Sequence, residues 1–221
     1  MEEKLKKYDK IISLGSNCYI KFFLKHIKYE QETFFFDNIG SPMWSVCELI
    51  KNNFDDVLNF NDYNSEMINK GCARIVTNTK YNLKFKHDLR DLRTGSNGVE
   101  FVKFKETYDR RIKRFQDLLS SSEDNVLFIR FEEIKENRMI NKSYDEKNKI
   151  SELEYIKLFS EFITSNFPNL KFKIVFISKT WGNKVDEKNK VVIIKEVQKI
   201  NDYKMSSIQI ADLLSHNVSL L

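Results

Sequence analysis

The 221-residue chain has few of the residues that interrupt or cross-link a fold: 2 prolines, 6 glycines and 3 cysteines. Such scarcity excludes a collagen-like chain and argues against a flexible linker or a low-complexity tail. No apolar run reaches the length of a membrane-spanning helix, so we expect no membrane partner. Hydrophobic residues make up 41% of the chain and charged residues 31%, which predicts one globular domain over residues 1–221.

The cysteines, Cys18, Cys47 and Cys72, are odd in number and form no CxxC pair. This pattern argues against a disulfide framework and against a zinc site, and we expect neither a metal nor another cofactor. The first ten residues, MEEKLKKYDK, are charged and lack the apolar core of a signal peptide. We therefore expect a cytoplasmic protein with reduced thiols, in which Cys47 and Cys72 are structural.

The net charge of +5 comes from 37 basic and 32 acidic residues spread along the chain. No basic block or aromatic-interleaved motif stands out, so a solvated mixed-charge surface is favoured over nucleic-acid binding. Nothing in the sequence indicates an oligomeric state.

The stretch that organises the chain is residues 10–27, KIISLGSNCYIKFFLKHI. Its apolar start predicts a buried strand over residues 11–14, and residues 15–17 (Gly-Ser-Asn) predict a tight turn. Apolar residues then recur at helical spacing, which sets Cys18 at a helix N-terminus, where the dipole favours a thiolate of lowered pKa. The alternative is that Cys18 is small core filler and that the turn only caps the helix.

Short apolar runs at 11–14, 34–36, 125–131, 171–177 and 191–195 predict buried strands separated by helices. Period-two alternation predicts a β-hairpin over residues 73–87. The expected fold is α/β: a mostly parallel, Rossmann-like three-layer sheet with helices on both faces and this hairpin inserted. Helices are expected over residues 42–52 (with Ser41 as N-cap), 99–120, 151–167 (with a capping box of Ser151 and Glu154) and 206–221. In such sheets ligands gather at the carboxyl ends of the strands, where Cys18 and Asp37 would lie.

Several motifs together resemble the family described as putative papain-like cysteine peptidase (DUF1796). They are LGSNC (14–18), FFFDNI (34–39), NNFDDVL (52–58), KHD (86–88), YDRRIKRFQDLL (108–119) and NVLFIRF (125–131), so the resemblance spans about residues 10–180. It implies a cysteine nucleophile at Cys18 and a histidine base at His87, and it keeps an α+β papain-like fold open as an alternative. Family members carry a Trp soon after the Asp of the aromatic motif, where this chain has Asn38.

Two weaker resemblances concern the same strand, turn and helix. The arrangement is similar to the first block of SGNH-type hydrolases. GSNC is loosely similar to the Gly-Asn-Cys motif of capsular polysaccharide acyltransferases of the WcbI kind. Both imply acyl transfer or ester hydrolysis on a carbohydrate.

Three histidines could serve as the base. His87 ends the alternating strand on the face of its apolar residues, so we expect it to point inward or into a cleft. The family resemblance favours it over the interpretation as a half-buried histidine of a sheet. His26 lies about 12 Å of helical rise from Cys18, too far to reach it. His216 follows Asp212 by four residues, one more than the SGNH spacing, and stays an alternative.

The sequence thus predicts a cysteine-dependent hydrolase in which Cys18 attacks a carbonyl, His87 moves the proton and Asp37 orients His87. The oxyanion would be held by the N–H of Cys18 and the amide of Asn17, and the substrate-binding set is Gly15, Ser16, Asn17 and Asp88. The substrate is left open as a peptide, an acyl compound or a glycan-linked group. The rivals are an SGNH- or WcbI-like acyltransferase or esterase, and a non-catalytic domain that binds an anion or carbohydrate at the helix N-terminus.

Overall fold

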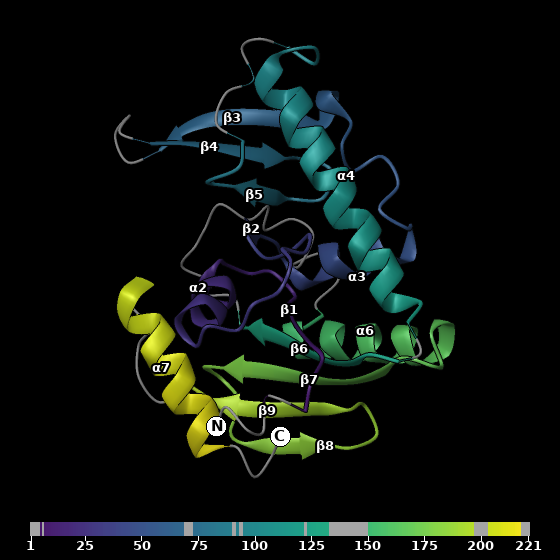
Figure 1. Ribbon diagram of the computed structural model, residues 1–221, viewed down its shortest axis with the longest axis vertical. Helices are drawn as coiled ribbons and strands as arrows, with labels where there is room; N and C mark the ends of the chain where they lie inside the picture. The colour runs from purple at the N-terminus through teal and green to yellow at the C-terminus, as the bar shows by residue number, and fades with distance from the viewer. Residues whose placement is uncertain are drawn as a thin grey trace.

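The computed structural model describes residue 5 and residues 7–68, 73–89, 92, 95–121, 123–132, 150–196 and 203–217. Over these residues the chain forms a mixed α/β structure with two sheets. Sheet A is mostly parallel and sheet B is antiparallel, and Figure 1 shows them one above the other with a long helix, α4, running beside both.

Sheet A has five strands in the order β1-β6-β7-β9-β8. Neighbouring strands are parallel except for β8, which pairs antiparallel with β9 at one edge. The strands are β1 (Lys10–Ser13), β6 (Asn125–Phe131), β7 (Lys171–Ser178), β8 (Lys184–Asp186) and β9 (Val191–Lys195). The apolar runs at 11–14, 125–131, 171–177 and 191–195 are therefore confirmed as strands, apart from residue 14, which follows β1.

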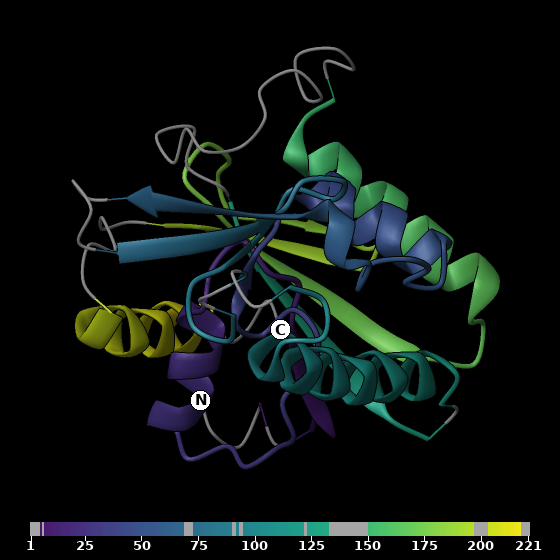
Figure 2. The same ribbon diagram turned by 90° about the horizontal axis from the view of Figure 1, so that it is seen from above.

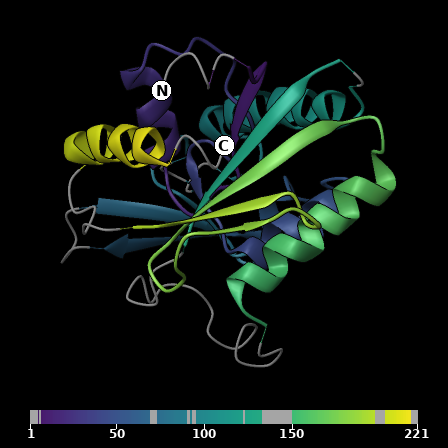
Figure 3. The ribbon, with the colours of Figure 1, turned by 90° about the horizontal axis from the view of Figure 1, so that it is seen from below.

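Helices cover both faces of sheet A, because each central strand is apolar on both sides. Along β6, Phe128 packs into a core with helices α3 (Met43–Lys51), α4 (Val99–Leu119) and α6 (Glu152–Asn166). Leu127 and Ile129 point the other way, into a core with α2 (Tyr19–His26) and α7 (Tyr203–His216). Figure 3 shows α6 and α7 on opposite sides of these strands.

Sheet B orders its strands β2-β5-β4-β3, so the predicted hairpin is part of a larger antiparallel sheet. Its strands are β2 (Ile39–Gly40), β3 (Tyr63–Ile68), β4 (Ala73–Asn78) and β5 (Leu83–Phe85), and the single-turn helix η1 (Phe60–Asp62) precedes β3. Figure 2 shows β3 and β4 extending away from α3 and α6. Phe85, Tyr63 and Val76 join the same core as Phe128, which connects the two sheets.

The prediction of a strand at Phe34–Phe36 is wrong. These three residues are fully buried, but Phe35 and Phe36 belong to a turn that ends at Asn38. Their rings pack edge-on against aromatic side chains of neighbouring segments, Phe35 against Tyr108 and Phe36 against Phe115, both of α4. A short apolar run signals burial but does not by itself distinguish a strand from an enclosed turn.

The helix predictions differ in their outcome. The long amphipathic helix is confirmed as α4, and the capping box of Ser151 and Glu154 begins α6 as expected. The prediction of Ser41 as a side-chain cap of α3 is wrong, because Pro42 takes the N-cap position and the Ser41 hydroxyl accepts no bond there.

The side chain of Gln31 protects the outer edge of sheet A. β1 is an edge strand, which would expose backbone groups to another chain. Gln31 Oε1 accepts a hydrogen bond from Ile11 N at 3.2 Å, and Gln31 Nε2 donates to Ile11 O at 2.6 Å. The amide of Gln31 thereby takes the place that a pairing peptide group would occupy.

Position 15 requires glycine for two reasons, its backbone conformation and the lack of room for a side chain. Its φ of 79° is left-handed, and a Cβ there would overlap the Ser41 hydroxyl. We expect Gly15→Ala to lower the free energy of unfolding by about 3 kcal/mol, from backbone strain plus overpacking. Gly95→Ala is the matched control, because Gly95 has a φ of 73° with no atom within 4 Å of a Cβ. It should cost only about 1 kcal/mol. Equal losses in urea denaturation would contradict the close approach of Ser41.

Candidate active site

Cys18 occupies the N-cap of α2, at the end of a turn that follows β1. Gly15 and Ser16 are left-handed, with φ of 79° and 70°, which reverses the chain within a few residues. Ser13 Oγ accepts a hydrogen bond from Gly15 N at 3.1 Å, and Asn17 Oδ1 accepts one from Tyr19 N at 2.9 Å. The predicted strand, turn and helix are therefore confirmed, with Cys18 beyond the carboxyl end of β1.

The Cys18 thiol is neutral in this environment. The residue is only 7% exposed, and burial raises the pKa of the thiol above its ordinary value. The backbone N–H of Cys18 and the ammonium of Lys86 act in the opposite direction but do not overcome burial. The expectation of a lowered pKa is contradicted, because desolvation outweighs the helix terminus.

A buried arginine, Arg130, forms hydrogen bonds that fix the turn before Cys18. Arg130 is fully buried in β6, and its Nη1 donates to Leu14 O at 2.7 Å and to Ser41 O at 2.8 Å. Its Nε binds Glu152 Oε1 at 2.6 Å, at the start of α6. The guanidinium thus joins the turn before Cys18 to the first turns of α3 and α6.

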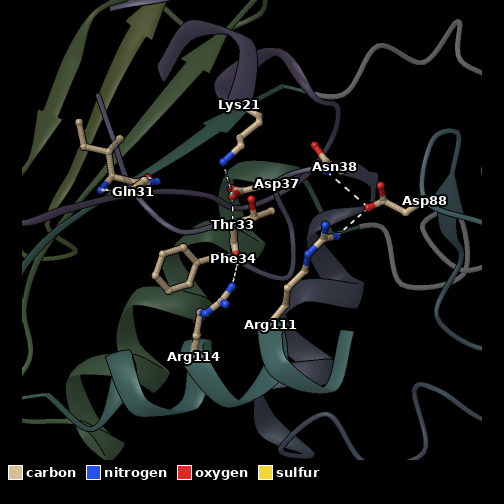
Figure 4. A network of polar contacts seen from close by, with 10 residues as sticks. Lys21, Gln31, Thr33, Phe34, Asp37, Asn38, Asp88, Arg111 and Arg114 are labelled. Atoms are coloured by element: carbon tan, nitrogen blue, oxygen red, sulfur yellow. Dashed lines mark hydrogen bonds and ion pairs between the residues drawn. The ribbon is translucent and has the colours of Figure 1, made fainter. Parts of the chain in front are cut away.

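Asp37 is a fully buried carboxylate beside β1 and α2. Its Oδ2 accepts a hydrogen bond from Phe34 N at 2.8 Å and lies 3.8 Å from Lys21 Nζ (Figure 4). Its Oδ1 has no hydrogen-bond partner among the described residues. Burial raises the pKa of Asp37 to about 6, although the Phe34 N–H and the charges of Lys21 and Arg111 act to lower it.

His87 and Asp88 follow β5 and point in different directions. His87 is exposed and forms no hydrogen bond or ion pair within the described part of the chain, so the expectation of an inward-pointing side chain is wrong. Asp88 Oδ2 accepts hydrogen bonds from Arg111 Nη1 at 2.6 Å, Tyr108 Oη at 2.8 Å and Asn38 Nδ2 at 3.5 Å. Burial alone would raise the pKa of Asp88, but these donors hold it below its usual value.

The short β2–β5 ladder brings the aromatic-Asp motif next to the KHD motif. Ile39 pairs with Phe85 and Gly40 with Lys84. Two residues further along the same antiparallel register, Asp37 and His87 would lie opposite each other. The contact from Asn38 to Asp88 shows that the two segments stay adjacent beyond the ladder. On the other side, a Cβ on Gly40 would lie 3.6 Å from Ser16 O, so β2 also borders the Cys18 turn.

The other histidines lie elsewhere. His26 is the exposed last residue of α2. His216 is exposed at the end of α7, and its Nδ1 lies 2.7 Å from Asp212 O. Among the cysteines, Cys47 is buried in α3 as predicted, and burial raises its pKa to about 12. Cys72 lies outside the described residues.

Sequence analysis missed three charged residues of this region. Arg130 is the one charged residue in the apolar run of residues 125–131, and a charge in a buried strand indicates that it has a buried partner. Arg111 follows the buried Tyr108 by three residues, so it borders the apolar stripe of α4, although the basic residues of that helix looked like an outer face. Lys86 offered no comparable signal, because its approach to Cys18 depends on the pairing of β2 with β5.

Comparison with known proteins agrees with the motifs. The sequence profile of the family described as putative papain-like cysteine peptidase (DUF1796) matches residues 9–182. The chain belongs to this family. The uncharacterised protein R408 of Acanthamoeba polyphaga mimivirus is 26% identical over 219 residues, which covers 92% of this chain and 96% of the relative. No solved structure was found to match the chain.

The family's description supports a hydrolase in general terms. Two further findings concern metal sites and membrane-spanning helices. Among the described residues there is no group of three His, Cys, Asp or Glu side chains arranged to hold a metal ion. None of the helices in the described ranges is long and apolar enough to span a membrane.

Lys86 provides a test of the charge next to Cys18. Because its ammonium lowers the pKa of the thiol, Lys86→Gln should raise that pKa and slow alkylation of Cys18 by iodoacetamide severalfold at pH 8. The control is Lys188→Gln, an exposed lysine between β8 and β9, the two strands of sheet A that lie furthest from β1. Peptide mass spectrometry would report Cys18 and Cys47 separately. Equal slowing in both variants would contradict a local effect of Lys86.

Asp37 should make stability depend on pH. Its folded-state pKa of about 6 is above the ordinary 3.8, so folding favours the protonated carboxyl and stability falls as the pH rises from about 4 through 6. Asp37→Asn removes this penalty and should stabilise the protein at pH 8 by up to about 3 kcal/mol relative to its effect at pH 4. Urea denaturation at both pH values checks this. A difference that does not change with pH would show that Asp37 is not desolvated.

Proposed function

We propose that this protein is a cysteine-dependent hydrolase in which Cys18 is the nucleophile, His87 the general base and Asp37 the residue that orients His87. The observation that carries the proposal is the convergence of three motifs: the β2–β5 ladder borders the Cys18 turn at Ser16 and aligns the KHD segment with the aromatic-Asp motif. The Lys86 ammonium, one residue before His87, already acts on the Cys18 thiol.

A neutral buried thiol calls for a base at the moment of attack rather than a standing thiolate. His87 would turn inward from its exposed position and accept the Sγ proton while Sγ forms a bond to the substrate carbonyl carbon. The unpaired Oδ1 of Asp37 is an acceptor suited to the other imidazole nitrogen, and Asp37 is ionised above a pH of about 6. After this movement the three groups would act as a nucleophile, a base and an orienting carboxylate.

The oxyanion would be stabilised at the N-terminus of α2. The N–H of Cys18 is one donor, and the Asn17 amide is the other, because its oxygen binds Tyr19 N while its Nδ2 stays available. The imidazolium then gives its proton to the leaving group, and a thioester remains on Sγ. A water molecule, deprotonated by His87, attacks the thioester and releases the acid and the free thiol.

The predicted substrate-binding set divides into two parts. Gly15, Ser16 and Asn17 form the turn itself, and Ser16 Oγ is buried with no hydrogen-bond partner among the described residues, so a substrate would meet the backbone of this turn and the Asn17 amide first. Asp88 has its Oδ2 occupied by three donors, which suits a role in holding the site together. Whether the substrate is a peptide, an acyl compound or a glycan-linked group is for the experiment to decide.

Two observations favour a non-catalytic domain as the second candidate. The pKa of the Cys18 thiol is raised, and His87 is exposed with no hydrogen bond to another described residue, as would also hold for a domain that only binds an anion at the α2 N-terminus. Profiling with peptidyl and acyl electrophiles separates the two, because an enzyme should be labelled at Cys18 far faster than at Cys47. Transfer to added carbohydrate alcohols instead of water would indicate an acyltransferase.

The catalytic roles predict different losses in three variants. With the electrophile or ester that reacts best, Cys18→Ala should abolish turnover, and His87→Ala should lower kcat by roughly 100-fold. The melting temperature of His87→Ala should stay near wild type, because the exposed side chain contributes little buried area. His216→Ala is the control and should keep full activity. Unchanged turnover in His87→Ala with a loss in His216→Ala would reassign the base.

A further inference from the structure

Arg111 lies between the two carboxylates of the site (Figure 4). It projects from α4 with only 11% of its side chain exposed, and its Nη1 donates to Asp88 Oδ2 at 2.6 Å. Its guanidinium also stacks on the Tyr108 ring, with Cζ 4.6 Å from the ring centroid, and Tyr108 Oη donates to the same Asp88 oxygen. The cation is thus fixed by an aromatic face and by the carboxylate it binds.

Because Asp88 is bonded to α4, it attaches the segment that carries the proposed base, residues 86–88, to that helix. It is one residue from His87 and two from Lys86, and both of those side chains are exposed. Besides Asp88, the segment is attached by the pairing of Phe85 with Ile39 and Val76 before it and by the buried Leu89 after it. The bonds from α4 to Asp88, with the longer one from Asn38, hold the segment at its middle, between these two attachments, and so restrict where Lys86 and His87 lie.

Arg111 also acts on Asp37. The groups that face this buried carboxylate are the Lys21 ammonium from α2, the Arg111 guanidinium from α4, and the backbone N–H groups of Phe34 and Ser13. The Arg111 guanidinium consequently acts on two carboxylates. It is hydrogen-bonded to Asp88, and its positive charge acts on Asp37, which has one unpaired oxygen.

We propose that Arg111 is a positioning residue of the active site: through Asp88 it fixes the Lys86–His87 segment, and its guanidinium lies between that segment and Asp37, the carboxylate proposed to orient His87. The inference rests on the proposed function for its consequence in catalysis. Its two physical parts, the fixed segment and the guanidinium beside Asp37, concern this chain's own groups and can be measured without turnover.

The charge of Arg111 gives the proposal a signature that a purely structural arginine lacks. Removing a nearby cation raises a carboxyl pKa, so Arg111→Met should raise the pKa of Asp37 by about 1 from its value near 6. The acid limb of the pH profile of kcat should move upward by the same amount. Arg111→Lys keeps the charge but loses the planar guanidinium, so it should leave the acid limb near wild type while weakening the hold on Asp88.

The experiment compares Arg111→Met and Arg111→Lys with Arg114→Met. Arg114 lies one turn further along α4, and it holds a different segment, the one before Asp37, through Thr33 O at 2.9 Å and Glu32 at 3.0 Å. It makes no hydrogen bond to Asp88 within the described residues. Arg114→Met therefore removes an arginine that binds a neighbouring segment from the same helix, but leaves the bonds to Asp88 intact. Carboxyl carbon NMR, with Asp37→Asn for assignment, follows the titration of Asp37, and hydrogen exchange follows the amides of residues 85–89.

We expect Arg111→Met to raise the pKa of Asp37 and to speed amide exchange at residues 85–89 by about tenfold or more, while Arg114→Met changes neither. An unchanged pKa, or equal changes in both variants, would overturn the proposal. If the two physical effects appear but Cys18→Ala keeps full turnover, the proposed function fails while the positioning by Arg111 stands. If Cys18→Ala is inactive and Arg111→Met keeps both kcat and its pH profile, Arg111 has no part in positioning.

Discussion

The hydrogen bonds of Arg130 are the constraint on which the site depends. A fully buried cation is tolerated only when it is paired, and here one guanidinium binds Glu152 and the carbonyls of Leu14 and Ser41. Those partners belong to the turn after β1, the start of α3 and the start of α6. Loss of any partner would leave a charge or a carbonyl unsatisfied in the core, which is costly. The turn that ends at Cys18 therefore has one well-determined position.

The second constraint comes from sheet B, which supplies the other half of the site. Its short ladder would hold little by itself, but α4 binds the segment beyond it through Asp88. Asp37 and Asp88 show two ways to bury a carboxylate. Asp88 is surrounded by donors and stays ionised, whereas Asp37 keeps an unpaired oxygen and a raised pKa. An incompletely satisfied buried carboxylate lowers stability, so Asp37 is the less favourable of the two for the fold.

Cys18 and His87, the proposed nucleophile and base, do not meet in this structure. The thiol is shielded and its pKa is raised, and the imidazole is exposed, so catalysis would require the His87 side chain to turn inward toward Cys18. The segment itself need not move, because Asp88 keeps it attached to α4. Family membership points to cysteine peptidase chemistry in general terms, and the movement of His87 is the step on which this chemistry would depend.

The sequence by itself determined the features that arise from neighbouring residues along the chain. Residues 125–131 and 171–177 form strands because a continuous apolar run suits a parallel strand buried on both faces. The stripe of α4 and the capping box of α6 follow from spacing alone, and so does the placement of Cys18 at the start of α2.

Only the tertiary structure decided which distant residues meet. Phe34–Phe36 became part of a buried turn because aromatic rings of α4 enclose it, and that environment cannot be deduced from the apolar run. Arg111 lies inward because Asp88 lies opposite, and His87 lies outward because β5 ends at Phe85. The same packing explains the thiol: the helix terminus was visible in the sequence, but the burial that outweighs it depends on the surrounding segments. Periodicity encodes how strongly a residue is buried, whereas its partners depend on contacts between segments far apart in the chain.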